Sequence, residues 1–72
     1  MNLDYPTWQE PLAAAILEFD PRQLPGKLQR AEEAIATRLE ELRLAGTAGQ
    51  EVRLLIDGLS IIRGIKQERL SV

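Results

Sequence analysis

The side chains that could do chemistry in this sequence are mainly carboxylates, because the chain contains no histidine and no cysteine. Glu32 is adjacent to Glu33 and Glu40 is adjacent to Glu41, and neighbouring residues on a helix point about 100° apart. Glu33 and Glu40 share a helix face, but they are about 10 Å apart along it, too far to share a proton or a metal ion. These carboxylates are therefore typical of a polar helix surface and predict no catalytic or metal site.

The other candidate motifs are equally incomplete. Ser60 falls on the polar side of a predicted helix, and no histidine is present to activate it as a nucleophile. The segment Gly46-Thr47-Ala48-Gly49 follows no strand and lacks the Gly-Lys-Ser/Thr sequence of a phosphate-binding loop. We therefore expect a protein that is not an enzyme and that uses no cofactor and no metal ion.

Basic side chains are the remaining candidates for ligand binding, and an antiparallel hairpin would gather five of them at one end. These possible anion contacts are Lys27, Arg30, Arg63, Lys66 and Arg69. They fit a solvated surface, an antiparallel dimer in which basic and acidic ends meet, or a phosphate or RNA contact. A net charge of −2 and a single Trp, Tyr and Phe argue against RNA, which needs a basic field and stacking side chains.

Proline and glycine divide the chain into three helical segments without a strand pattern between them. The first is a short helix over about 8–19, in which Trp8, Leu12, Ala15, Ile16 and Phe19 recur on one face. Two starts remain open: a capping box formed by Thr7 and Glu10, or Pro11 as the first helical residue. Proline at position 21 predicts the end of this helix at Asp20.

The second and third segments predict a long antiparallel helical hairpin over about 25–45 and 48–70. Apolar residues form a bundle seam along the first of these helices, at Leu28, Ala31, Ile35, Leu39 and Leu42. Gly46 stands where a left-handed C-terminal cap is expected, and Thr47 with Gln50 predicts a capping box for the next helix. The short linker forces the two helices to be antiparallel neighbours.

The last helix carries apolar residues on more than one face. One arc, expected to pack on the preceding helix, consists of Val52, Leu55, Ile56, Leu59, Ile62 and Leu70. A second stripe of Leu54, Ile61 and Ile65, with Gly58 beside it, lies nearly opposite Val52. Each of its large residues would forgo about 1.5–3 kcal/mol in water. Either the first helix or another chain must cover this stripe, and another chain is favoured because the first helix must also help to cover the seam between the two long helices. The sequence thus predicts an interface at Leu54, Gly58, Ile61 and Ile65.

The small size of the chain also favours association with a second copy. A single domain over 1–72 has a marginal core, and without cysteine it has no disulfide to stabilise it. We expect a homodimer that forms a four-helix-type bundle, with a parallel or antiparallel arrangement left open. No apolar stretch is long enough to span a membrane and no basic signal stands at the N-terminus, which predicts a cytoplasmic protein.

A resemblance to known sequences covers nearly the whole chain. The residues that carry it are Trp8, Leu12, the run from Ala15 to Asp20, Leu24, Lys27 to Arg30, Ala31-Glu32, Ala34-Ile35, Arg38-Leu39 and Leu55 to Arg63. The chain resembles a group of short bacterial proteins in which a Trp, an Ile-Leu-Glu-x-Asp helix and an Ala-Glu-x-Ala-Ile-x-x-Arg-Leu helix recur. The resemblance implies a bacterial helical protein and assigns no activity or site residue.

The expected function is that of a non-enzymatic module for protein–protein interaction or oligomerisation. Its expected partner is a second copy or another bacterial protein. The alternative is a small RNA- or phosphate-binding hairpin that uses the five basic residues of one end.

Overall fold

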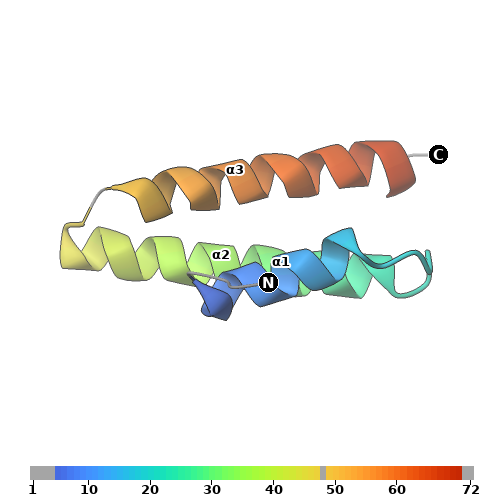
Figure 1. Ribbon diagram of the computed structural model, residues 1–72, viewed down its shortest axis with the longest axis horizontal. Coiled ribbons are helices and arrows are strands. Elements are labelled where there is room, and N and C mark those ends of the chain that lie inside the picture. The colour runs from blue at the N-terminus through green and yellow to red at the C-terminus, as the bar shows by residue number, and fades with distance from the viewer. Residues whose placement is uncertain (1–4, 48, 71–72) are drawn as a thin grey trace.

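The computed structural model describes residues 5–47 and 49–70, and within them the chain is helical without a strand. Figure 1 shows the three main helices, and a π-helical segment, η1, continues the last of them. Their bounds are α1 Pro6–Ile16, α2 Leu24–Ala45, α3 Gln50–Ile65 and η1 Lys66–Leu70. The predicted all-helical fold, with a short first helix and a long antiparallel hairpin, is confirmed.

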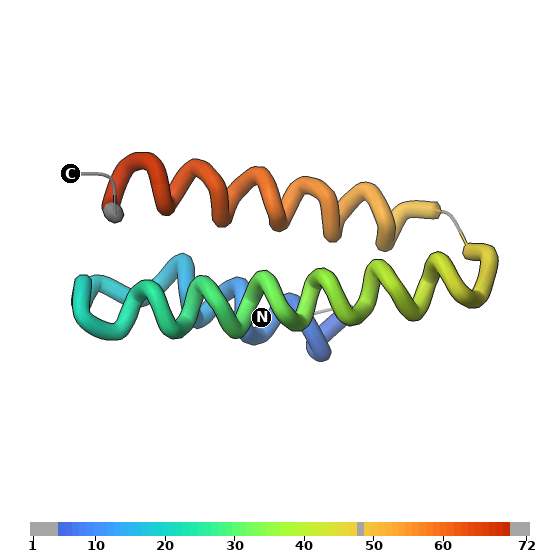
Figure 2. The backbone as a smooth tube through the Cα atoms, turned by 180° about the vertical axis from the view of Figure 1, so that it is seen from behind, coloured from blue at the N-terminus to red at the C-terminus, as the bar shows by residue number. Residues whose placement is uncertain are grey.

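The hairpin of α2 and α3 forms the body of the molecule, and α1 lies along α2 (Figures 1 and 2). The first and third helices run in the same direction, opposite to α2. The molecule measures 39 × 26 × 16 Å, so it is thin in one direction. Within the described residues, no helix is long and apolar enough to cross a membrane.

The turn between α2 and α3 is fixed by Gly46, which has a φ of 69°. Its N–H donates to the Arg43 carbonyl and the Thr47 N–H donates to the Leu42 carbonyl, which is the Schellman arrangement. The predicted left-handed cap is therefore confirmed. The predicted capping box of Thr47 and Gln50 is wrong, because α3 begins after Gly49 without a side-chain cap. The predicted start of this helix at residue 48 lies outside the described residues.

The first helix differs from prediction at both ends. It begins at Pro6, and Pro11 lies inside it, so both predicted starts are wrong. It ends at Ile16 rather than Asp20, since the carboxylates of Glu18 and Asp20 accept hydrogen bonds from backbone N–H groups two residues later. Such local bonds compete with the helix. Consequently Phe19 leaves the predicted apolar face and is 78% exposed.

The core lies where the three helices meet. The buried side chains are Trp8, Leu12 and Ala15 of α1, Leu24, Leu28, Ala31, Ile35 and Leu42 of α2, and Leu55 and Ile62 of α3. Four of the five predicted seam residues of α2 are buried, and the fifth, Leu39, is half-buried against the same cluster. Burial of this apolar surface is the main force that holds α1 on the hairpin.

Candidate interaction surface

One face of the hairpin is closed by α1, and Gly58 makes this possible. A Cβ at position 58 would lie 3.1 Å from Ile35 Cδ1, 3.3 Å from Leu12 Cδ2 and 3.6 Å from Trp8 Cζ3. Glycine therefore lets the side chains of α1 approach the backbone of α3 closely. With a larger residue at position 58, the side chains of Trp8 and Leu12 could not lie this close to α3.

This arrangement corrects the predicted interface. Gly58 is buried within its own chain, and Leu54 and Ile65 are half-buried against the core. Of the four predicted interface residues only Ile61 is exposed, at 44%. The sequence pattern was misread because the buried centre of α3 runs along Leu55, Gly58 and Ile62, so that Leu54 and Ile65 border the core instead of lying opposite it.

A charged cluster of Glu51 and Arg38, together with Trp8, also holds α1 on the hairpin. The indole N–H of Trp8 donates to Glu51 Oε2 over 3.2 Å, and Arg38 donates from Nε to the same oxygen over 2.7 Å. Arg38 Nη2 also donates to Glu51 Oε1 over 3.1 Å. The bonds from Arg38 above all, with that from Trp8, hold the pKa of Glu51 below its ordinary value despite partial desolvation. This cluster joins α1, α2 and α3.

The opposite face of the hairpin is left open. We call it the open face, and it consists of Ala36 and Leu39 on α2 with Val52, Ile56 and Leu59 on α3. Ile56 is 52% exposed and Leu59 is 37% exposed, while Leu39 and Val52 are half-buried. The three residues of α3 belong to the arc that the sequence assigned to packing on α2. Leu55 and Ile62 of that arc are buried as expected, whereas Ile56 and Leu59 stay in contact with solvent.

Two shallow hollows mark the open face along the seam between α2 and α3. The hollow nearest the hairpin turn is lined by Ala36, Leu39, Glu40, Leu42, Arg43, Thr47 and Val52. The hollow at the other end is lined by Glu32, Leu59, Ile62, Arg63 and Lys66. The open face thus has an apolar centre and a charged group at each end. That composition is typical of surfaces that bind other proteins.

The five predicted anion contacts do not converge. Lys27 binds Glu18 over 2.7 Å, which is the main cause that lowers the pKa of that carboxyl, and Lys66 binds Glu32. The guanidinium of Arg69 lies over the Phe19 ring, 5.7 Å from its centre. Three of the five cations are therefore engaged within the chain.

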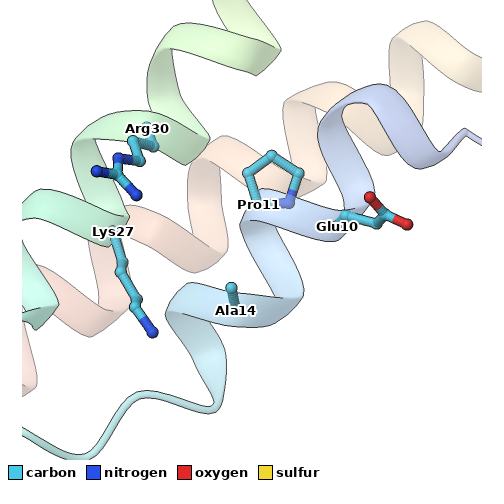
Figure 3. A pocket seen from close by; sticks show the side chains of 5 residues that line it. All are labelled: Glu10, Pro11, Ala14, Lys27 and Arg30. Atoms are coloured by element: carbon cyan, nitrogen blue, oxygen red, sulfur yellow. The ribbon is translucent and has the colours of Figure 1, made fainter.

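The remaining two predicted anion contacts lie on different surfaces. Arg63 lines the open face, whereas Arg30 lies with Lys27 beside a hollow between α1 and α2. Figure 3 shows these two cations across that hollow from Pro11, with the carboxylate of Glu10 turned away from both. The cations point in different directions, so the hollow has no converging donors for a phosphate.

Sequence reasoning missed the cluster of Glu51, Arg38 and Trp8, because these residues are up to 43 positions apart and each resembles a surface or lid residue on its own. Within the described residues, no group of three acidic, histidine or cysteine side chains is placed to hold a metal ion. A scan against protein-family models and searches of curated proteins and of solved structures find no match. The candidate surface is consequently defined by the geometry of this chain alone.

Proposed function

We propose that the protein is a non-enzymatic interaction module that binds a polypeptide along its open face. The observation that carries this proposal is the uncovered apolar centre formed by Leu39, Val52, Ile56 and Leu59. A helix docked there would cover the seam between α2 and α3 from the side that α1 leaves free. The result would be a bundle with helices on both faces of the hairpin.

The phosphate- or RNA-binding alternative has less support. Lys27 and Lys66 already neutralise carboxylates of the same chain, and a phosphate would have to displace Glu18 and Glu32 from them. The guanidinium of Arg69 lies over the Phe19 ring. An open face with an apolar centre matches a polypeptide better than a polyanion.

Site-specific photo-crosslinking in cells that produce the full chain tests the proposal. A photo-reactive phenylalanine analogue at Leu59, or separately at Leu39, should form a covalent adduct with a polypeptide on irradiation. The same analogue at Ile61 is the matched control, because Ile61 is similarly exposed but lies outside the open face. Adducts no more abundant at positions 59 and 39 than at position 61 would overturn the proposal.

A further inference from the structure

We infer that the polypeptide bound to the open face is a second copy of this chain, related by a two-fold axis that runs parallel to the helices. This inference rests on the proposed function and names its partner. In this arrangement each α2 lies against α3 of the other copy, and the two open faces form one four-helix core. Both hairpin turns then lie at the same end of the dimer.

The chain exposes more surface than a compact monomer of its mass. Its accessible surface is 5253 Å². A compact monomer of 8.1 kDa exposes about 4500 Å² by the usual scaling of surface with mass. The excess is about 750 Å² over the whole molecule, and the exposed side chains of Ile56 and Leu59 on the open face contribute to it.

The charges that flank the open face differ between its two sides. On α2, Glu33 and Glu40 lie beside Ala36 at the outer margin of this face, and both are exposed. On α3, Arg53 lies at the outer margin and Arg63 lines the face itself beside Leu59, and both are exposed. Within the described residues neither arginine has an ion-pair partner. The α2 side therefore offers the carboxylates of Glu33 and of Glu40, the latter already paired with Arg43 of α2, and in the described part of the chain the α3 side offers two arginines without such a pair.

Contacts within the hairpin fix which residues lie at the same level along its axis. Glu32 binds Lys66, and Ile35 lies against Gly58. A residue of α2 and a residue of α3 therefore lie at the same height along the hairpin axis when their numbers add up to between about 93 and 98. Glu33 therefore lies level with Arg63, and Glu40 lies level with Arg53. A two-fold axis parallel to the helices preserves these levels between copies.

The axis orientation follows from these matched charges. With the axis parallel to the helices, the carboxylates on α2 of each copy face the arginines on α3 of the other, with Glu33 level with Arg63 and Glu40 level with Arg53. An axis perpendicular to the helices, in the plane between the two faces, would place α2 on α2 and α3 on α3. It would oppose like charges, which disfavours it. The exposed apolar side chains of the open face thus favour a dimer, and charge selects its geometry.

Charge reversal on the purified full chain, measured by sedimentation equilibrium, tests this geometry. Glu33→Arg and Arg63→Glu should each raise the dimer dissociation constant about tenfold, since two symmetric contacts become repulsive. The double variant restores opposite charges and should return to within about threefold of the wild type. Glu10→Arg on α1 and Arg30→Glu on α2 apply the same charge changes away from the open face and should leave the constant within about threefold of wild type.

The outcomes separate this inference from the proposed function. A wild-type chain that stays monomeric at every concentration overturns the second copy as the partner. The proposed function would still stand if the photo-crosslinked adduct at Leu59 contained a different polypeptide. A dimer in which the double variant is no tighter than either single variant overturns the parallel-axis geometry.

Discussion

Glu51 shows how one residue can connect three helices. Its carboxylate accepts from the Trp8 indole of α1 and from the Arg38 guanidinium of α2 while it belongs to the first turn of α3. A carboxylate in the first turn also interacts favourably with the helix dipole. The residue therefore supports both its own helix and the position of α1.

Replacement of this carboxylate should weaken the fold in a pH-dependent way. Because the pKa of Glu51 is lowered on folding, its contribution is present above the ordinary value of about 4.5 and is lost as the pH falls through the folded value. Glu51→Gln should lower the free energy of unfolding by about 1–2 kcal/mol at pH 7. The difference from wild type should shrink below pH 4, as followed by Trp8 fluorescence during urea titration. A difference that stays constant from pH 7 to pH 3 would contradict this role, and Glu10→Gln serves as the exposed control.

Gly58 and Gly64 provide a second test at the residue scale. A side chain at position 58 would collide with Ile35, Leu12 and Trp8, whereas a Cβ at position 64 meets no atom within 4 Å. Gly58→Leu should destabilise the fold by about 1–3 kcal/mol or more through overpacking. Gly64→Ala should stabilise it by about 0.5–1 kcal/mol through helix propensity. Thermal unfolding of both variants measures this contrast, and equal effects would show that position 58 is not closely packed.

At the scale of elements, local signals predicted the helices well and their assembly poorly. The seam spacing of α2 and the left-handed glycine after it are local properties, and both appear as expected. The end of α1 was missed because backbone hydrogen bonds to Glu18 and Asp20 compete with a helical pattern that includes Phe19. The face of α3 covered by α1 was also missed, since the absence of a side chain at Gly58 matters only once Trp8 lies above it.

The end of α2 gives the prediction at this scale. Gly46 adopts a left-handed conformation that a Cβ makes unfavourable, so Gly46→Ala should destabilise the chain by about 1 kcal/mol. Gly26→Ala is the matched control, because Gly26 lies within α2 and a Cβ there meets no atom within 4 Å. It should stabilise the helix by up to about 1 kcal/mol. Chemical denaturation of both variants measures the difference, and a stabilising Gly46→Ala would contradict the turn geometry.

At the scale of the whole molecule, the hairpin has two faces and α1 covers one of them. Exposed apolar surface on the hairpin was predictable, because the last helix has more apolar surface than one neighbour can bury. The side left open was not predictable from periodicity, which cannot show on which side of the seam α1 lies. The structure assigns α1 to the side of Leu54 and Gly58, and it leaves Ile56 and Leu59 in contact with solvent.

The most direct test of this account compares two single aspartates in α3 by the molecular mass of the purified chain in sedimentation equilibrium. Leu59→Asp places a charge in the centre of the open face, whereas Ile61→Asp places it in the stripe that the sequence first indicated. Both side chains are exposed, so both variants should remain folded, as helical circular dichroism can verify. We predict that Leu59→Asp is a monomer at concentrations where the wild type and Ile61→Asp are dimers. A dimer of Leu59→Asp together with a monomer of Ile61→Asp would contradict the account.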